Sequence, residues 1–432
     1  MLKYTQAYTM FKEMIADGRL RRGERMPSIR RAAELYRISR TTVQNAYFQL
    51  AAEGYIYAKP QSGYFVAGGP KAPATPMPRP QVQTPPRLDL TGNSADLSSF
   101  DFSLWQRYIK SALRQRQRTY SEPQGEYDLR CALADYVRER RNVVTAPEHI
   151  VVGAGVQMLL EILCVLLKGR RTVSFPDGSF VQGSTVFAAH GYTVRTRYKD
   201  ADIIYVSPSH MNRQGDVMPI QRRLELCAHS ADTGAVVIED DFENDFLYSS
   251  TPTPSLYALG SGNVVYMGAF SALLLPGIRI SFMVLSPALA AAYHQMKDTF
   301  AQTASKTEQI ALCAYLRDGN MKSRTKKIRR LYTGKAKTLC ALLAKALPDH
   351  PVRVGENGLQ VQIETPMLPD SAPFEQAGLA LYIVKEKSGK NIVVVSPSAV
   401  PADRLEEAAL AVAAALYKAE EAAKAKQSKD IY

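Results

Sequence analysis

Apolar residues recur every three or four positions near the start of the chain, which is typical of amphipathic helices. The first such stretch ends at Asp17-Gly18, because glycine readily adopts the left-handed conformation that closes a helix. Ser28 and Ser39 are placed as the N-caps of a second and a third helix. The buried stripes of these predicted helices are Tyr4, Ala7, Tyr8, Phe11, Met14 and Ile15, then Ile29, Ala32, Ala33 and Leu35, then Val43, Ala46, Tyr47 and Leu50.

Two short aromatic segments follow the third helix. Residues 55–59 and 64–66 flank a turn at 60–63, a pattern that predicts a β-hairpin. Three small helices and a hairpin are typical of a winged helix-turn-helix, whose third helix enters the major groove of DNA with its N-terminal residues near base edges. The residues that we expect to bind DNA are Ser28, Arg30, Ser39, Arg40, Thr41, Thr42, Lys59 and Gly63.

Positive charge is concentrated in this segment. The formal net charge of the chain is +13, and residues 1–66 hold eleven Lys and Arg against five Asp and Glu, a net charge of +6. A compact basic segment joined to a larger domain favours a polyanion as partner. Arg40 pairs with a guanine, clamps a phosphate or merely solvates an exposed helix face, and the basic surroundings favour the DNA contacts.

The pattern changes after a proline-rich stretch. Seven prolines between 68 and 88 exclude a helix or a central strand and predict an extended linker. Apolar runs then alternate with helical segments, which indicates an α/β fold whose sheet is covered on both faces. Buried strands are expected at 150–152, 171–175, 203–207, 235–240, 264–268 and 280–285. The expected organisation is a DNA-binding domain at 1–67, a linker at 68–88, an α/β domain with a smaller C-terminal αβ subdomain at 89–418, and a fraying tail at 419–432.

Composition narrows the class of protein. The 432 residues are 46% hydrophobic and 22% charged, the profile of a globular protein with a sizeable core. No apolar run of eighteen residues occurs, because Glu161 interrupts the most apolar stretch, and no leader is visible, so we expect a cytoplasmic protein without a membrane partner. The five cysteines are scattered without Cys-x-x-Cys spacing, which disfavours disulfides and a metal site.

Four short segments carry a further similarity: Pro27-Ser28-x-Arg30, Ser39-Arg40-x-Thr42-Val43, Ala46-Tyr47 and Glu53-Gly54-Tyr55. On these segments, residues 1–67 resemble the winged-helix domain of the GntR family. Residues 88–418 resemble a fold-type I aminotransferase, above all in the segment Gly268-Ala269-Phe270-Ser271 and its continuation to Arg279. The whole chain therefore resembles the MocR-type regulators, in which a DNA-binding domain is fused to an aminotransferase-like domain that binds pyridoxal phosphate.

The resemblance implies a position for each cofactor-binding group. Asp240 occupies the position of the family's acid that pairs with the pyridinium nitrogen of the cofactor. Ser271 and Arg279 occupy positions of family residues that bind the cofactor phosphate. Gln157 lies in the turn that would cradle the phosphate at a helix start, and Tyr120 lies in a segment that packs near the partner's cofactor phosphate. From the residues alone, Asp240 is equally a hydrated acid at a strand end. Arg279 pairs either with an internal carboxylate or with a phosphate or other anion, and the anion is favoured.

Ala272 occupies the position where the resemblance requires the Schiff-base lysine. Covalent attachment of the cofactor needs an amine nucleophile, and no lysine occurs between Lys199 and Lys297. Aminotransfer needs the same amine to move a proton, so we expect a protein that is not an enzyme. Further departures from the family pattern are Phe242, Val156, residues 212–215, and the lack of a carboxylate-binding arginine at 392–396, where only Lys390 is nearby.

Three functions stay open. The first is a sequence-specific regulator that binds a double-stranded DNA operator as a homodimer and senses a small effector, either non-covalent pyridoxal phosphate or an amino-acid-related molecule. The second is a pyridoxal-phosphate-dependent aminotransferase fused to a DNA-binding domain, against which Ala272 argues. The third is a dimerisation scaffold that binds no ligand at all.

Overall fold

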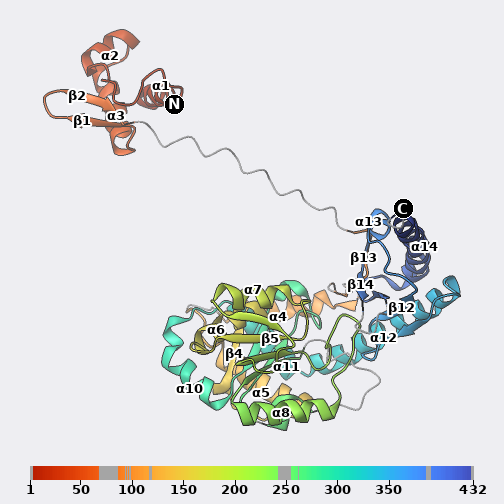
Figure 1. The fold of residues 1–432 in the computed structure, drawn as a ribbon. Coiled ribbons are helices and arrows are strands. Elements are labelled where there is room, and N and C mark those ends of the chain that lie inside the picture. Colours follow the sequence, from red (N-terminus) through yellow and green to blue (C-terminus); the bar gives the residue numbers. More distant parts are fainter. Residues whose placement is uncertain are drawn as a thin grey trace. The chain divides into compact units, whose positions relative to one another are not determined.

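The structure, a computed structural model, describes residues 3–67, 86–92, 94, 96, 99–115, 119–241, 254–260, 262–385 and 391–429. The chain divides into two units, Met1–Thr84 and Pro85–Tyr432, both of which are drawn in Figure 1. Residues 68–85 of the expected linker lie outside the described part of the chain, as do Phe242 and Lys390.

The first unit has the predicted three helices and hairpin. The side chain of Ser28 accepts a hydrogen bond from the backbone N–H of Arg31 at 3.2 Å, and that of Ser39 accepts one from Thr42 at 3.0 Å. Both serines are therefore N-caps, as the sequence predicts. The elements of this unit are α1 (Lys3–Ala16), α2 (Ile29–Tyr36), α3 (Arg40–Ala52), β1 (Ile56–Lys59) and β2 (Gly63–Val66).

Tyr47 fixes α3 in the core of this unit. Its ring meets the rings of Phe11 and Tyr64 edge to face, with centroids 5.2 and 5.3 Å away. Its hydroxyl donates a hydrogen bond to the carbonyl oxygen of Pro27 at 2.9 Å, and burial raises the pKa of this phenol. One side chain thus ties α3 to α1, to the segment before α2 and to the hairpin, as buried tyrosines with a satisfied hydroxyl do.

The second unit contains a seven-stranded mixed sheet in the order β4-β10-β9-β8-β7-β5-β6. Only β10 runs antiparallel to its neighbours, β4 and β9. The six strands expected from apolar runs are all present, and the pattern missed β6, an exposed edge strand. The strands are β4 (Ile150–Gly153), β5 (Thr172–Phe175), β6 (Thr193–Thr196), β7 (Ile203–Val206), β8 (Val236–Asp240), β9 (Val264–Ala269) and β10 (Ser281–Val284).

Helices cover both faces of this sheet (Figure 1). Alternate residues of β10 pack into different cores: Phe282 and Val284 lie in the core shared with α4, α5 and α11, whereas Met283 lies in the core shared with α6, α7 and α10. A sheet that is buried on both faces confirms the predicted α/β fold. The helices are α4 (Phe102–Arg114), α5 (Tyr127–Arg141), α6 (Val156–Leu166), α7 (Val181–Ala189), α8 (Ile220–Thr233), α9 (Leu256–Leu259), α10 (Pro287–Met296) and α11 (Lys306–Arg317).

The long helix α12 leads from the large sheet into a smaller αβ domain (Figure 1). Its apolar side chains pack with those of the C-terminal helix α14 over a sheet in the order β11-β12-β15-β14. A separate parallel pair, β3 and β13, places Leu88 beside Leu379. The elements are β3 (Leu88–Asp89), α12 (Asn320–Ala346), β11 (Val352–Val354), β12 (Val361–Thr365), α13 (Ala372–Gln376), β13 (Leu379–Ala380), β14 (Tyr382–Lys385), β15 (Asn391–Val395) and α14 (Leu405–Lys429).

The boundaries of this unit differ from those expected at both ends. Helix α14 continues to Lys429, and within it Ala419 is buried and Glu420 lies 2.9 Å from His350. The sequence predicted a fraying tail from 419; at the start of that segment, alanine's high helix propensity and the contact with His350 keep Ala419 and Glu420 packed. At the other end Leu88, the last residue of the expected linker, is already paired in β3.

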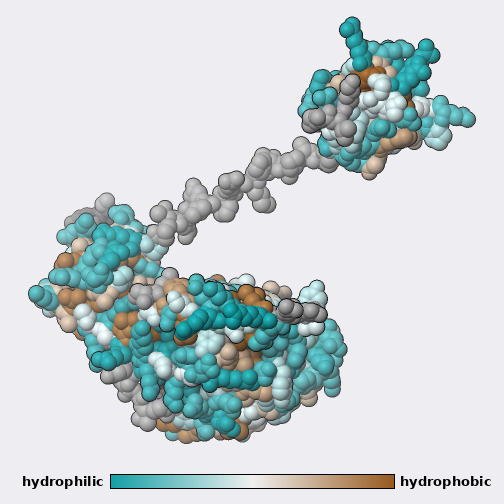
Figure 2. Space-filling view, turned by 180° about the vertical axis from the view of Figure 1, so that it is seen from behind, coloured by the Kyte–Doolittle hydropathy of each residue, from teal (hydrophilic) through white to brown (hydrophobic). Residues whose placement is uncertain are grey.

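The surface, the helices and the metal-ligating side chains of the described residues bear on whether the chain has a membrane span, a metal site or a disulfide. Figure 2 shows a largely hydrophilic surface with scattered apolar residues on the face turned to the viewer. Among the described helices, none is both long and apolar enough to cross a membrane. The described His, Cys, Asp and Glu side chains form no group of three or more that could hold a metal ion. All five cysteines are free.

Candidate functional sites

The N-terminal end of α3 presents Arg40 and Thr41 to solvent. Neither side chain has a hydrogen bond or an ion pair within the described part of the chain. The hydroxyls of Ser39 and Thr42 lie 2.7 Å apart, and Ser39 also caps the helix, so these two hydroxyls are engaged within the protein. Of the four residues that the sequence singled out here, Arg40 and Thr41 are therefore the two whose side chains are available to a groove of DNA.

The start of α2 carries the other candidate arginine. Ser28 caps this helix, and Arg30 follows in its first turn with its Nε 3.2 Å from Oε1 of Glu34. Both members of this pair are exposed, and such pairs one helical turn apart contribute only about 0.3–0.5 kcal/mol. A phosphate can therefore displace Glu34 from Arg30.

The hairpin tip holds the remaining two candidates. Lys59 and Gly63 face each other across the turn, and Gly63 has a φ of 94°, a conformation that favours glycine. Lys59 is exposed. Tyr57, which sequence reasoning missed, is 48% exposed and stacks on Phe65 with ring centroids 5.8 Å apart. The alternating aromatic residues of the two segments could have indicated this pair, because residues opposite one another in a hairpin share a face.

The register of the large sheet gathers the cofactor candidates at one edge. Ser281 of β10 pairs with both Gly153 of β4 and Ala269 of β9, and Met267 of β9 pairs with Asp240 of β8. The carboxyl ends of β4, β9 and β8 therefore lie together, at the edge where α/β sheets bind ligands. We call the turns at this edge the rim. The candidate residues on the rim are Gln157, Asp240, Ser271 and Arg279.

Arg279 lies across the turn between β4 and α6. Its Nη2 is 3.5 Å from the carbonyl oxygen of Ala154, and a methyl group added at Gly155 would lie 2.4 Å from the same nitrogen. Gly155 precedes α6 and offers no side-chain cap, so the first N–H groups of this helix, including that of Gln157, stay available. A guanidinium beside an open helix N-terminus is suited to bind an anion, phosphate above all.

Asp240 is held by its neighbour on β7. The hydroxyl of Tyr205 donates a hydrogen bond to the Asp240 carboxylate. Burial, reinforced by this carboxylate, raises the pKa of Tyr205 well above its ordinary value, so the phenol stays protonated. The Tyr205 ring lies between Phe175 and Phe180, with centroids 5.0 and 5.2 Å away. Sequence reasoning missed Tyr205 and Phe180, although aromatic residues near the ends of two adjacent buried strands were a visible signal.

The turn after β9 contains Ser271 and Ala272, both half-buried. Ala272 packs against the core that includes Leu273. The carbonyl oxygen of Leu273 accepts a hydrogen bond from Nε of Arg324 at 3.0 Å, and Arg324 is buried on α12. Helix α12 thus fixes the turn, and the side chain at 272 is a methyl group without an amine.

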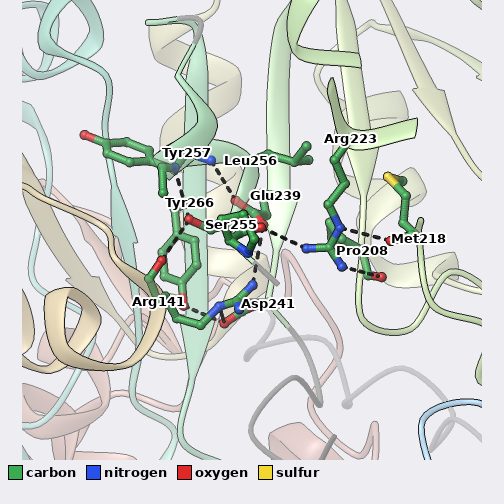
Figure 3. A network of polar contacts seen from close by, with 12 residues as sticks. Arg141, Pro208, Met218, Arg223, Glu239, Asp241, Ser255, Leu256, Tyr257 and Tyr266 are labelled. Carbon is green, nitrogen blue, oxygen red and sulfur yellow. Dashed lines mark hydrogen bonds and ion pairs between the residues drawn. The ribbon is translucent and has the colours of Figure 1, made fainter. Parts of the chain in front are cut away.

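A buried network of charged side chains holds the end of β8 (Figure 3). Glu239 points to the opposite face from Asp240, because side chains alternate along a strand. Arg141 places its Nε 3.0 Å from Oδ2 of Asp241 and its Nη2 3.9 Å from Oε1 of Glu239. The hydroxyl of Tyr266 donates to the same Asp241 oxygen at 2.6 Å. Burial by itself would lower the pKa of Arg141, but the charge of Asp241 and its other neighbours raises it overall.

The same network binds the chain at 254–257. The carboxylate of Glu239 accepts a hydrogen bond from the backbone N–H of Tyr257 at 3.0 Å (Figure 3). Nη1 of Arg223 donates to the carbonyl oxygen of Pro254 at 3.0 Å. Burial raises the pKa of Glu239, and the charge of Arg141 opposes part of that rise. Two arginines and two acids thus balance one another beneath the rim, and they fix the strand that carries Asp240.

Tyr120 lies in the segment before α5, beside the N-terminal end of α11. Its side chain is 101% exposed, and its backbone carbonyl accepts a hydrogen bond from Nζ of Lys306 at 3.3 Å. Residues 212–215, which differ from the family pattern, contact the smaller domain. Nε2 of Gln362 donates a hydrogen bond to the carbonyl oxygen of Gln214 at 2.8 Å, and the Arg213 guanidinium lies 4.2 Å from the Tyr382 ring centroid.

Known proteins resemble the chain over nearly its whole length. Residues 3–66 match the bacterial regulatory proteins of the gntR family, and residues 91–203 and 198–402 match aminotransferase class I and II. The chain is 32% identical over 419 residues to YdeL of Bacillus subtilis (strain 168), named an uncharacterized HTH-type transcriptional regulator, across 91% of this chain and 88% of YdeL. It is 28% identical over 398 residues to the probable rhizopine catabolism regulatory protein MocR of Rhizobium meliloti, across 83% and 80% of the two chains.

The chain belongs to the MocR-type HTH transcriptional regulators. A solved structure supports the fold of the second unit: an archaeal alanine:glyoxylate aminotransferase superposes with a TM-score of 0.68 at 20% identity, across 77% of this chain and 91% of that one. At this identity the likeness shows the fold alone. This MocR-type regulator therefore combines a DNA-binding GntR domain with a fold that normally binds pyridoxal phosphate.

Proposed function

We propose that this MocR-type regulator senses a phosphate-bearing ligand on its aminotransferase-like domain without transforming that ligand. Ala272 carries the proposal, because the turn after β9 presents a methyl group where the resemblance requires a lysine. No lysine between Lys199 and Lys297 replaces it. A reaction with the aldehyde of pyridoxal phosphate needs an amine nucleophile, so the domain keeps the means to bind but not the means to react.

The rest of the rim fits the remainder of the cofactor. Arg279, Ser271 and the N-terminus of α6 would hold the phosphate, and Asp240 would pair with a protonated ring nitrogen. Pyridoxal phosphate, when bound, supplies an electrophilic aldehyde and an electron-accepting ring. The same groups suit a preformed adduct of the cofactor with an amino acid, because phosphate and ring are unchanged in it.

On this proposal the winged helix binds a double-stranded operator, and two copies of the chain join through the aminotransferase-like domains. A symmetric dimer places two winged helices on paired half-sites. The fully exposed Tyr120 supports a partner, because the resemblance assigns its segment to the partner's phosphate site. A ligand then alters transcription by binding two arrangements of the dimer with different affinity.

Calorimetry with pyridoxal phosphate tests the sensor. We expect reversible binding at one site per chain, competition by inorganic phosphate, and about tenfold or greater weakening in Arg279→Gln, since a charge-assisted hydrogen bond contributes about 1.5–3 kcal/mol. Arg195→Gln removes an exposed arginine of β6 and serves as the matched control. After borohydride treatment, mass spectrometry should find no cofactor attached to the protein.

Each alternative has its own signature in the same experiment. Cofactor attached after borohydride, or conversion of an amino acid to its keto acid, would favour the aminotransferase. Absence of binding heat, together with a dimer by light scattering and intact operator binding, would favour the ligand-free scaffold. A monomer at micromolar concentration would contradict the paired half-sites.

A further inference from the structure

A second basic surface lies on the aminotransferase-like domain, outside the rim. Helix α12 is 27 residues long and contains nine Lys and Arg but no Asp or Glu. Some of these cations, such as Arg324 and Lys335, are buried, where Arg324 binds backbone carbonyls and Lys335 binds Asp96. Arg329 is half-buried, and the remaining six are exposed. We define the α12 cationic face as the exposed residues Lys322, Lys326, Lys327, Arg330 and Lys337.

Helical spacing aligns this face. Lys322, Lys326 and Arg330 are four residues apart, so each lies about 6 Å further along the helix than the one before. The opposite side of α12 is packed: Ile328 and Tyr332 are buried in the core of the large domain. The cations therefore cannot turn inward, and they form a row of positive charge along the surface.

Three cations of this row, Lys326, Lys327 and Arg330, face no acid within the described part of the chain. Lys322 lies 3.4 Å from Glu139, but both side chains are exposed, so the pair is weak. Lys326, Lys327 and Arg330 have no ion pair with any carboxylate that the structure describes. Like charges four residues apart destabilise a helix by about 0.2–0.5 kcal/mol per pair. An anionic partner would relieve that repulsion.

We propose that the α12 cationic face binds the phosphate backbone of duplex DNA next to the site held by the winged helix. The identity of this polyanion rests on the DNA-binding function of the first unit. Four of the five residues of the face are lysines, which act as point charges and favour phosphates over base edges. This contact therefore adds affinity and salt dependence but no sequence preference.

The winged helix and the α12 cationic face belong to the same chain. Once the winged helix is bound, the second contact is intramolecular, and its effective concentration is high. A weak electrostatic surface can then contribute measurably to the affinity.

A membrane surface is disfavoured as the partner of this face. A helix that lies on lipid needs large apolar side chains free to enter the bilayer. None of the exposed large hydrophobic side chains of the described chain lies on α12, and its apolar side is occupied by the core. The row of cations has no apolar flank of its own.

Two charge-matched variants of the full-length chain test the proposal. Lys326→Gln/Lys327→Gln/Arg330→Gln removes three charges from α12, whereas Lys168→Gln/Arg195→Gln/Lys199→Gln removes three exposed charges near the β5–β6 edge of the large sheet. The net charge falls from +13 to +10 in both. Fluorescence anisotropy follows binding to a long duplex of random sequence between about 50 and 300 mM salt. Circular dichroism verifies that both variants are folded.

We expect the α12 variant to reduce the slope of log affinity against log salt by about 2 to 3, since each lost phosphate contact removes about 0.9. Its affinity at low salt should fall about tenfold or more, and that of the control variant by less than twofold. Equal effects of the two variants, or no binding of the unmodified chain to the random duplex, would overturn the proposal. So would loss of binding to phosphatidylserine vesicles in the α12 variant with unchanged DNA binding.

The proposed function is tested on different DNA. Specific binding is measured as the ratio of two affinities: that for the DNA fragment upstream of the chain's own coding region and that for the random duplex. Failure of that specificity contradicts the sequence-specific regulator and leaves the α12 result standing. Intact specificity with identical behaviour of the two charge variants contradicts only the role of α12.

Discussion

The two units differ in how far apart in the sequence their candidate residues lie. Arg40 and Thr41 are neighbours, presented by one capped helix end. Gly155 follows β4, Asp240 ends β8 and Arg279 lies between β9 and β10. Only the register of β4, β10, β9 and β8 brings them to one rim. The proposed DNA-binding surface therefore depends on local structure, whereas the rim depends on the whole domain.

This difference predicts which changes should affect which site. A substitution in the buried network beneath β8 should disturb the rim and the stability of the second unit, and should leave the first unit intact. A substitution at the exposed end of α3 should affect DNA binding alone. The following predictions test this separation, beginning with the largest effect.

Arg141→Leu should destabilise the second unit by about 3–5 kcal/mol, because it removes the guanidinium that faces both of the buried carboxylates Glu239 and Asp241. Trp105 is the only tryptophan of the chain and is buried in this unit, so its fluorescence during denaturant unfolding reports on the second unit alone. Specific DNA binding by the folded variant should stay within about twofold, because the winged helix is a separate unit.

The sign of the pH dependence sharpens this prediction. Burial raises the pKa of Glu239, so its protonated form is favoured in the folded state and its ionisation opposes folding as pH rises. In Arg141→Leu the ionised carboxylate of Glu239 destabilises the fold more than in the unmodified chain. The loss of stability caused by the substitution should therefore become smaller as the pH is lowered. Arg138→Leu, on the same helix but in an exposed pair with Asp135, is the control and should change stability by less than about 1 kcal/mol. Similar losses in both variants would contradict the separation.

Arg40→Ala should weaken specific operator binding by about 1–3 kcal/mol, or roughly 5- to 150-fold, if this arginine reads a base edge. Affinities for the operator fragment and the random duplex, measured at one salt concentration, give the effect. A uniform loss on both duplexes would place Arg40 on a phosphate instead. Unfolding monitored by Trp105 should not change, and Arg195→Ala should bind both duplexes normally. Unchanged operator binding in Arg40→Ala would contradict the local DNA surface.

The same contrast explains how much could be predicted from the sequence. Helix periodicity, Ser28, Ser39 and the aromatic hairpin are local signals, and the first unit was predicted almost element by element. Buried strands were also found, because each is a continuous apolar run. The exposed edge strand β6 was missed, since it carries no such run.

Contacts between distant residues could not be predicted in this way. The aromatic residue at the end of β7 was visible in the sequence, but its partner was not: no local pattern indicates that Tyr205 binds Asp240, or that Arg324 of α12 holds the turn at Ala272. The buried network of Arg141, Glu239 and Asp241 appears in the sequence only as scattered charges. Such pairs are set by sheet register and helix packing, which depend on the complete fold.

The smallest effect is expected where the chain enters the second unit. Glu407 of α14 is hydrogen-bonded by Arg404 and by Arg87, and these contacts lower its pKa to about 2. A lowered carboxylate pKa stabilises the fold above the ordinary pKa of about 4.5, and this contribution is lost as pH falls through about 2. Arg87→Ala should therefore move the Glu407 titration upward, which carbon NMR of the side-chain carboxyl measures directly. Arg353→Ala, an exposed arginine of the same small domain, should leave that titration unchanged. An unshifted Glu407 in Arg87→Ala would mean that Arg404 alone holds the carboxylate, and that the entry of the chain is not fixed by this long-range contact.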